Sequence, residues 1–378
     1  MCPEFSIQGI FILEMIGLNE NDYMRIAIQE AKKGTGFTSP NPLVGAVVVK
    51  DGRIISQDYH HKCGEFHAER NALLNCSENP QGADIFVTLE PCCHKGKTPP
   101  CTDIIIEKRI KRVFIGSSDP NPLVAGKGEK ILREHGIEVK SGVLKEECDA
   151  INEPFFHFIT KGTPYVVMKY AMTADGKIAT KTGASKWITG ESARERVQQD
   201  RLKYTGIMVG IGTVLADDPL LTCRLEGGRN PIRIICDSKL RTPFKSNIVK
   251  TANEAETIIA TLSEDKDKIN KYEKYGIKVI RTKEKDGHID LKNLMQILGE
   301  MKIDGILLEG GGELNYSALK SGIVNKVQCY IAPKLFGGEK AKTPVRGEGV
   351  EFPSEAVMLE EPKISMLEDD ILIEWKVK

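Results

Sequence analysis

The chain has 378 residues, of which 40% are hydrophobic, and this is enough apolar material to fill more than one core of ordinary domain size. Lysine plus arginine and aspartate plus glutamate each number 53, so the formal net charge is zero at pH 7. A balanced charge provides no general attraction to nucleic acid or to anionic membranes, and it favours a small-molecule partner.

The chain begins with a segment, 1–17, that we expect to be an N-terminal extension without a role in the fold, because Met15 offers a second plausible start. The segment lacks the basic stretch and the small-residue cleavage site of a secretory signal. No apolar run reaches the roughly 18 residues that are needed to span a bilayer. We therefore expect a cytoplasmic protein with no membrane partner.

The first part of the chain alternates helices and strands. An amphipathic helix is predicted over Asp22–Lys33, and it is followed by a strand over Val44–Val49 and a hairpin turn at Asp51-Gly52. Further elements are expected in this order: a helix from about His67, a strand Ile85–Leu89, a helix Cys101–Arg109, a strand Val113–Gly116 and a helix Gly128–His135. This alternation predicts an α/β domain with helices packed on a sheet.

Proline and glycine mark a boundary within Cys148–Pro164, where Pro154 and the turn Lys161–Pro164 interrupt the pattern. We therefore expect one domain over 18–160 and a second over 161–378. The elements predicted in the second domain are strands Val166–Lys169, Ile207–Gly210, Ile232–Cys236, Thr257–Thr261, Lys278–Arg281, Gly305–Leu308, Lys326–Pro333 and Ile371–Val377, with helices Glu191–Tyr204 and Leu291–Met301. They predict a second α/β domain.

Three potential metal ligands fall beside predicted element ends in the first domain. His67 opens a helix, Cys92 follows a strand, and Cys101 opens the next helix. One imidazole and two thiolates leave the fourth tetrahedral position for water, as a catalytic zinc ion requires. Glu69 comes two residues after His67 and could reach that water without binding the metal. The pattern predicts a catalytic zinc site with Glu69 as its acid and base.

A structural zinc site in a binding module without catalysis is the alternative. Such a site needs a fourth protein ligand. The side chains that could supply it are His60, His61, Cys63, Cys93 and His94. A deaminase of transfer RNA or of free nucleosides is a further alternative, but eight residues separate Cys92 from Cys101, whereas those enzymes have a Pro-Cys-x-x-Cys spacing.

The loop Cys92–Cys101 resembles the deaminase domain of the bifunctional riboflavin-biosynthesis enzymes, whose usual form is Glu-Pro-Cys-Ser-His followed by Gly-x-Thr-Pro-Pro-Cys. Cys93 stands where that family has serine, and Cys92 keeps the family's position after the proline. We therefore assign the ligand role to Cys92 rather than to Cys93.

The resemblance extends over the rest of the first domain, through the segments 39–45, 59–60, 118–122 and 126–128. It implies that five residues hold the pyrimidine and the ribose phosphate: Asn41, His60, Lys97, Asp119 and Asn121. Taken singly, each has an ordinary explanation, since asparagine and aspartate before proline are common turn formers and a lone lysine is usually solvated.

The second domain resembles the reductase domain of the same family, which has the dihydrofolate-reductase type of fold. The resemblance is carried by Val167–Ala179 and by the later segments Ser185–Thr189, Gly210–Thr222, Asp237-Ser238 and Glu309–Gly312. In the last of these, a buried strand runs into three glycines and a predicted helix. Such a turn can bind a phosphate at the helix N-terminus, although a plain tight turn explains it equally well. No Gly-x-Gly-x-x-Gly motif indicates a Rossmann site.

The reductase resemblance implies an NADPH site and a substrate site. The residues implied to line the cofactor site are Ala171, Trp187, Thr213, Asp217, Ser238, Gly311, Gly312, Glu313, Leu314, Asn315, Tyr316 and Ser317. The residues implied to contact the substrate are Ser185, Arg201, Leu221, Arg224 and Glu309. Either arginine could bind a phosphate through two hydrogen bonds or be a surface cation. Residue type alone would place Trp187 in the core.

Together these resemblances imply a cytidine-deaminase-like α/β/α domain with one zinc ion, joined to a dihydrofolate-reductase-like α/β domain that uses NADPH. In the first reaction, zinc-activated hydroxide attacks the amine-bearing carbon of a diaminopyrimidinone ribosyl phosphate, and Glu69 carries the proton to ammonia. In the second, NADPH delivers hydride to C1 of the opened sugar, giving a ribitylaminouracil phosphate. The family also implies a homo-oligomer, either a dimer or a tetramer.

Overall fold

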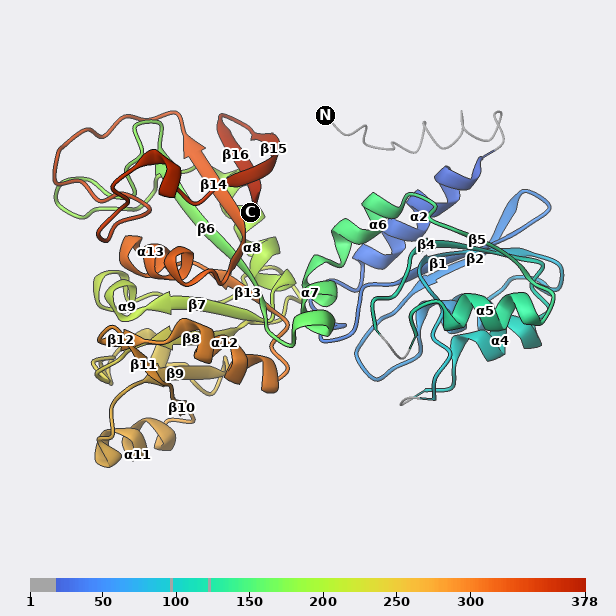
Figure 1. Cartoon of the computed structure of the whole chain (residues 1–378), viewed down its shortest axis with the longest axis horizontal. Helices are drawn as coiled ribbons and strands as arrows, with labels where there is room; N and C mark the ends of the chain where they lie inside the picture. Colours follow the sequence, from blue (N-terminus) through green and yellow to red (C-terminus); the bar gives the residue numbers. More distant parts are fainter. Residues whose placement is uncertain (1–17, 96–97, 122–123) are drawn as a thin grey trace. The chain divides into compact units, whose positions relative to one another are not determined.

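A computed structural model describes residues 18–95, 98–121 and 124–378 (Figure 1). The predicted N-terminal extension lies outside these residues. The internal contacts divide the chain between Thr160 and Lys161 into two compact units, called here unit 1 and unit 2. Among the described residues, no helix is both long and apolar enough to cross a membrane.

Unit 1 is built on a five-stranded sheet in the order β2-β1-β3-β4-β5. Its strands are β1 Gly45–Lys50, β2 Arg53–Tyr59, β3 Asp84–Leu89, β4 Arg112–Ser117 and β5 Glu138–Ser141. Strand β1 is antiparallel to β2 and β3, whereas β3, β4 and β5 run parallel. The carboxyl ends of β3 and β4 therefore lie at the same edge of the sheet.

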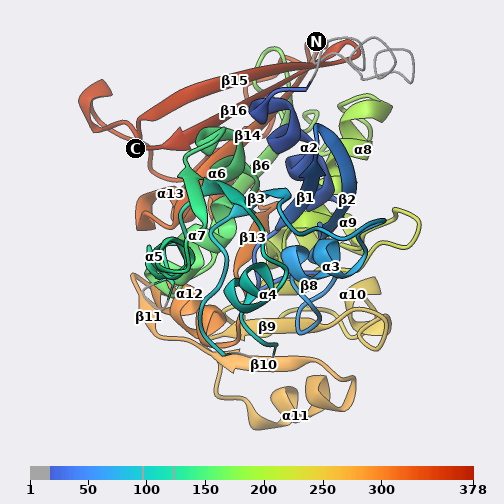
Figure 2. The same ribbon diagram turned by 90° about the vertical axis from the view of Figure 1, so that its right-hand side faces the viewer.

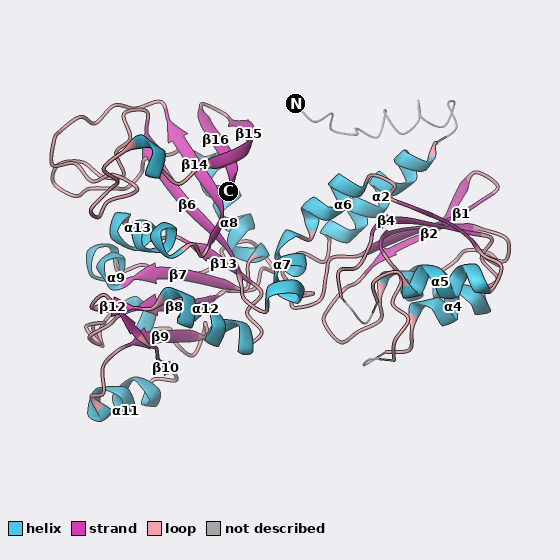
Figure 3. Cartoon of the chain, in the orientation of Figure 1, coloured by secondary structure: helices cyan, strands magenta, loops and turns pink. Residues whose placement is uncertain are grey.

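Helices cover both faces of this sheet (Figure 3). Val47 and Val49 of β1 point to the face that is covered by α2 (Glu20–Lys32) and α6 (Lys145–Ile151). Ala46 and Val48 point to the opposite face. The helices on that face are α3 Ala68–Leu74, α4 Cys101–Glu107 and α5 Lys127–Glu134. The alternation of strand side chains thus produces the predicted α/β/α layers.

The segment that the prolines marked as a boundary is helical over most of its length, because α6 is followed by α7, Glu153–Lys161. Pro154 is the second residue of α7. A proline in the first helical turn costs no hydrogen bond, since the amide groups there have no partner within the helix. Pro154 therefore begins this helix rather than breaking it.

Unit 2 contains a nine-stranded sheet in the order β10-β9-β8-β7-β13-β6-β14-β16-β15. Its strands are β6 Tyr165–Thr173, β7 Gly206–Gly210, β8 Ile232–Cys236, β9 Thr257–Thr261, β10 Lys278–Arg281, β13 Gly305–Leu308, β14 Val324–Ala332, β15 Leu359–Leu367 and β16 Asp370–Val377. The strands from β10 to β14 are parallel, and β16 and β15 add antiparallel pairs. Figure 2 shows β15 and β16 at one edge and β10 at the other. A separate ribbon joins β11 Glu284–Lys285 to β12 His288–Ile289.

Helices also cover both faces of the second sheet. One face carries α12 Leu291–Glu300 and α13 Gly312–Ser321. The other carries α8 Glu191–Lys203, α9 Ile211–Asp217, α10 Asn247–Lys250 and α11 Lys266–Lys274. The predicted mixed α/β class is confirmed for this unit. Helices α9, α10 and α11, the ribbon strands β11 and β12, and the edge strand β15 were not predicted.

Candidate active sites

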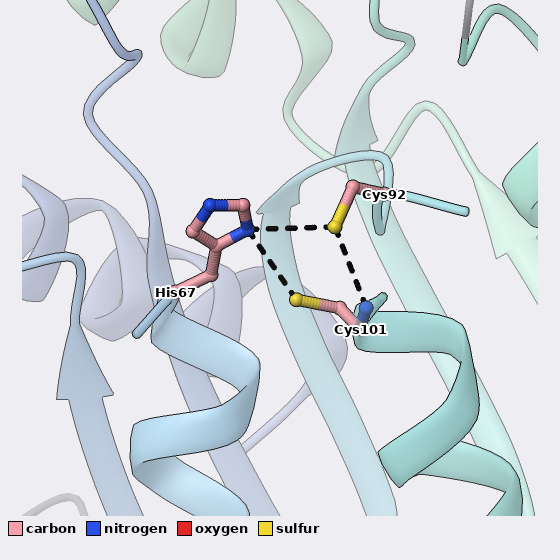
Figure 4. A group of neighbouring side chains, drawn as sticks. All are labelled: His67, Cys92 and Cys101. Atoms are coloured by element: carbon pink, nitrogen blue, oxygen red, sulfur yellow. Dashed lines mark hydrogen bonds between the residues drawn. The ribbon is translucent and has the colours of Figure 1, made fainter. Parts of the chain in front are cut away.

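Three side chains of unit 1 meet where β3 ends (Figure 4). His67 is the residue immediately before α3, Cys92 follows β3, and Cys101 is the first residue of α4. The Nδ1 atom of His67 lies 3.4 Å from Sγ of Cys92 and 3.5 Å from Sγ of Cys101. All three potential ligand atoms lie within 4.8 Å of one another. The structure thus gathers the residues that the sequence motif selected.

The spacing of these atoms fits a tetrahedral zinc ion. Typical Zn–N and Zn–S bonds at a tetrahedral angle place the nitrogen and sulfur atoms roughly 3.6 Å apart. The cluster contains three protein ligands among the residues that the structure describes. The side chains considered as a fourth ligand do not join it: His60, His61, Cys63, Cys93 and His94. This set leaves one coordination position for water.

The cluster also favours a thiolate at Cys92. The backbone amide of Cys101 donates a hydrogen bond to Sγ of Cys92 at 3.4 Å. Hydrogen bonding from the Cys101 thiol, and then from His67, holds the pKa of Cys92 well below the usual value of a thiol. The pKa of Cys93 is raised instead, chiefly by burial. Cys92 is therefore better prepared than its neighbour to bind a metal ion.

Glu69 lies in the first turn of α3 and is 3% exposed. Its Oε2 atom is buried without a hydrogen-bond partner among the described residues. Burial, followed by the nearby charge of Cys92, raises the pKa of this carboxyl group to about 7. A buried carboxylate oxygen without a partner is costly unless water or an ion satisfies it. This atom therefore fits a site that holds water beside a metal ion.

His60 and Asn41 form a hydrogen-bonded pair in the same unit. His60 is 2% exposed, and its Nδ1 atom lies 3.0 Å from the carbonyl oxygen of Phe66. A carbonyl can only accept, so Nδ1 carries the proton, and Nε2 accepts a hydrogen bond from the Asn41 amide at 3.1 Å. Burial lowers the pKa of His60. The pair is neutral, it fixes the orientation of the Asn41 amide, and the His60 ring stands 5.1 Å from the His67 ring.

Two of the remaining candidates in unit 1, Asp119 and Asn121, follow β4. Asp119 is 9% exposed, and its Oδ1 atom accepts a hydrogen bond from the backbone amide of Asn121 at 2.8 Å. Burial raises the pKa of Asp119 to about 6, and the charges of Glu90 and Cys92 act in the same direction. The carboxyl group of Asp119 therefore interacts electrostatically with Cys92 of the metal-ligand cluster. Lys97 lies outside the described residues.

In unit 2 several candidate residues lie just past the carboxyl ends of neighbouring parallel strands: Thr213 and Asp217 after β7, Ser238 after β8, and 309–317 after β13. Helices α9 and α13 begin there, directly after β7 and just beyond β13. Their N-cap residues, Gly210 and Gly311, provide no side-chain cap. The first-turn amides are thus available to a ligand. A Cβ atom added at Gly311 would meet only Oγ1 of Thr213, at 3.8 Å, so there is room beside this turn. The arrangement fits the phosphate groups of a dinucleotide.

An ion pair with side chains only 14% and 15% exposed joins Arg201 of α8 to Glu309, which follows β13. Arg201 binds Glu309 through two hydrogen bonds, Nε to Oε1 at 2.8 Å and Nη2 to Oε2 at 3.0 Å, and its Nη1 atom donates to the Thr222 carbonyl at 3.0 Å. The positive charges of Arg201 and Lys169 hold the pKa of Glu309 at about 2, although burial alone would raise it. Lys169 was not among the predicted site residues. A charged lysine at the end of an otherwise apolar predicted strand was the sequence feature that could have identified it. Glu309 and the Thr222 carbonyl already accept hydrogen bonds from Nε, Nη1 and Nη2 of Arg201. Few donors of this guanidinium therefore remain for a substrate phosphate.

Comparisons with known proteins agree with this geometry. Residues 18–117 match the cytidine and deoxycytidylate deaminase zinc-binding region, and residues 164–373 match the RibD C-terminal domain. The riboflavin biosynthesis protein RibD of Actinobacillus pleuropneumoniae is 58% identical over 360 residues, which cover 95% of this chain and 96% of that protein. The chain belongs to the RibD family.

Solved structures of RibD proteins share the whole architecture. A diaminohydroxyphosphoribosylaminopyrimidine deaminase and 5-amino-6-(5-phosphoribosylamino)uracil reductase from Thermotoga maritima is 39% identical with a TM-score of 0.84, covering 95% of this chain and 98% of its own. RibD of Acinetobacter baumannii, in its first crystal form, is 34% identical with the same TM-score and the same coverage. The RibD fold therefore extends over both units.

The other residues that the RibD resemblance selected in unit 2 differ in their surroundings. Trp187 is 60% exposed, so the expectation of a core tryptophan from residue type is wrong. Gly312 and Asn315 face a loop of the same unit, because Asn315 donates to the Pro344 carbonyl at 2.8 Å. The residues that are exposed or half-buried are Ala171, Ser185, Thr213, Asp217, Arg224, Ser238, Glu313, Leu314, Tyr316 and Ser317. Leu221 is 4% exposed.

Proposed function

We propose that this chain catalyses two successive steps of riboflavin biosynthesis, deamination in unit 1 and reduction in unit 2. The substrate is a diaminopyrimidinone ribosyl phosphate, and the final product is a ribitylaminouracil phosphate. The observation that carries the deaminase assignment is the buried, unpartnered Oε2 atom of Glu69 beside a cluster of three metal ligands. A structural zinc site with four protein ligands binds no water, so it would not explain a buried carboxylate oxygen beside the metal ligands.

In unit 1, His67, Cys92 and Cys101 would hold the zinc ion. When bound, zinc would act as a Lewis acid that makes water nucleophilic near neutral pH. Glu69 would take the proton of the attacking water and pass it to the departing ammonia. The residues proposed to hold the pyrimidine and the ribose phosphate are Asn41, His60, Lys97, Asp119 and Asn121.

In unit 2, NADPH would supply the hydride, and the protein would orient cofactor and sugar. The cofactor phosphates would lie at the uncapped starts of α9 and α13, with Trp187 against the cofactor. Glu309, Lys169 and Arg201 would order the substrate side of the site. Arg224 is exposed and therefore a better phosphate ligand than Arg201, which Glu309 already binds. Ser185 and Leu221 would complete the substrate contacts.

The chain would act as a homo-oligomer, either a dimer or a tetramer. The edge strand β15 exposes Ile364 and Met366 at 69% and 63%, next to exposed Met358. An apolar sheet edge of this kind favours association with another copy. The reducing cytoplasm would suit the zinc site of unit 1, because it keeps the Cys92 and Cys101 thiols available for metal. Light scattering of the purified chain tests the oligomeric state.

The assay that tests the proposed function supplies the purified, zinc-loaded chain with the diaminopyrimidinone ribosyl phosphate and records ammonia release and NADPH oxidation together. Ammonia release that precedes NADPH oxidation is the expected result. If a folded, zinc-loaded sample released no ammonia, the deaminase assignment would be overturned. The reductase assignment would then be tested alone with the deaminated intermediate.

A further inference from the structure

Glu90 is a buried carboxylate that the deamination mechanism leaves unused. It follows β3 and precedes Pro91 and the metal ligand Cys92, and it is 5% exposed. Its side chain accepts hydrogen bonds from four backbone amides of a distant segment. The donors and distances are Asp119 at 3.4 Å, Gly126 at 3.0 Å, Gly128 at 3.1 Å and Glu129 at 3.3 Å.

These four amides belong to two places in the chain, the segment after β4 that carries Asp119 and Asn121 and the start of α5. One donor, Asp119, follows β4, and the other three lie where α5 begins. The N-cap residue of α5, Gly126, has φ of 77° and provides no side-chain cap. A carboxylate from another element therefore caps this helix. Hydrogen bonds from amides to a buried carboxylate are among the stronger ones, because the acceptor is charged.

A glycine at the start of α5 allows this helix to approach Pro91 and the metal ligand Cys92 closely. A Cβ atom added at Gly128 would stand 2.2 Å from the carbonyl oxygen of Pro91. Only glycine permits this contact. The start of α5 thus packs directly on the residue that precedes Cys92, and Glu90 binds it there.

We infer that Glu90 is a positioning residue of the deaminase, because its carboxylate holds Asp119 and the start of α5, Gly126–Glu129, at a fixed place beside the metal ligands. This inference rests on the proposed function, in which Asp119 and Asn121 contact the substrate. Glu90 itself touches neither substrate nor metal. Loss of its charge frees Asp119 and the start of α5 and weakens substrate binding, while the three metal ligands keep their places.

The test compares Glu90→Gln, which keeps the size of the side chain, with Glu129→Gln as the matched control. The Glu129 side chain lies on the same helix and binds Arg133 and Ser141, and it does not contact Glu90 through its carboxylate. Four kinds of measurement are made on the full chain: zinc content, amide hydrogen exchange, the kinetics of ammonia release (kcat and KM), and NADPH oxidation with the deaminated intermediate.

For Glu90→Gln we expect faster exchange at the amides of Gly126 and Gly128. We also expect the KM for the pyrimidine to rise by roughly tenfold, because even a small displacement of Asp119 and Asn121 loses their contacts with the substrate. Zinc content and NADPH oxidation stay at the wild-type level, and Glu129→Gln changes none of these quantities. Loss of zinc, or an unchanged KM, would overturn the inference, since a purely structural role lowers the active fraction and leaves KM unaltered.

Two further outcomes are distinguishable. If the wild-type chain releases no ammonia, the proposed function fails and the inference fails with it. If the wild-type chain releases ammonia and Glu90→Gln matches it in KM, only the inference about Glu90 fails. A Glu90→Ala variant removes all four hydrogen bonds, and we expect a larger rise in KM than for glutamine, which can still accept through its carbonyl oxygen.

Discussion

Each unit places a glutamate of low exposure in its candidate site, and the surroundings of the two carboxylates differ in opposite ways. Glu69 of unit 1 has an oxygen without a partner, and its pKa is raised to about 7 by burial. Glu309 of unit 2 is bound through both oxygens by Arg201, and its pKa is held at about 2. One carboxylate can exchange a proton near neutral pH, and the other stays ionised.

This difference matches the chemistry that each unit is proposed to perform. A deaminase needs a group that takes a proton and gives it back, so its carboxylate must be free of permanent partners. A reductase that takes hydride from a cofactor needs fixed charges that orient the substrate. The surroundings of a buried glutamate, more than the residue type, therefore indicate its role.

The largest effect is expected for Glu69→Gln. Loss of the proton acceptor should lower deamination by roughly 100- to 10,000-fold, which is the usual contribution of a general acid and base. Zinc content and NADPH oxidation with the deaminated intermediate should not change, since both depend on other residues. Glu65→Gln, an exposed neighbour, is the control. Deamination at the wild-type rate in Glu69→Gln would remove Glu69 from the mechanism.

Arg201→Ala should destabilise unit 2 by about 3 kcal/mol, because it leaves the charge of Glu309, whose side chain is only 15% exposed, with its closest partner missing. Both tryptophans of the chain, Trp187 and Trp375, belong to unit 2, so tryptophan fluorescence in a urea titration reports on this unit alone.

The control for this prediction is Arg281→Ala, which breaks an exposed ion pair with Glu264 whose side chains are 57% and 76% exposed. It should cost about 1 kcal/mol or less. If Arg201→Ala and Arg281→Ala lowered the free energy of unfolding equally, the expected contrast between the largely buried pair and the exposed pair would be contradicted.

The stability of unit 2 should fall in acid for the same reason. Because the pKa of Glu309 in the folded chain lies below its ordinary value of 4.5, the ionised group stabilises unit 2 above that value. The stabilisation, about 3 kcal/mol, is lost as the pH falls toward 2. Urea titrations between pH 5 and pH 2 should therefore bring the wild-type chain closer to Glu309→Gln, which cannot titrate. A constant difference between them would contradict this pKa.

The smallest effect is expected for Trp187→Ala. The side chain is 60% exposed and lies 4.9 Å from the Arg194 guanidinium, so its loss should leave the fold intact. If Trp187 packs on the cofactor, the KM for NADPH should rise about fivefold, which corresponds to roughly 1 kcal/mol of aromatic contact. Phe at the same position should restore most of the affinity. A KM equal to that of the wild type would place the cofactor elsewhere.

Much of unit 1 was predictable because its chemistry lies in one short stretch of chain. His67, Cys92 and Cys101 each stand at the end of a predicted element, and such positions converge at one edge of a sheet. The predicted strands of both units are present, since buried parallel strands are read easily as apolar runs.

Long-range partners were not predictable. Arg201 and Glu309 are 108 residues apart, and no local pattern links them. Glu90 binds backbone amides, which any residue provides, so its role has no sequence signature beyond the family motif. The strand β15 contains Pro362 and is exposed over most of its length, which hides it from a search for alternating apolar residues.

The most direct test of the account is to remove zinc from the full chain with a chelator and to measure both activities on the same sample. The account predicts that ammonia release is lost and returns when zinc is restored, whereas NADPH oxidation with the deaminated intermediate continues throughout. Loss of both activities would show that the zinc ion supports the whole fold. Ammonia release that survives complete zinc removal would contradict the proposed deaminase site.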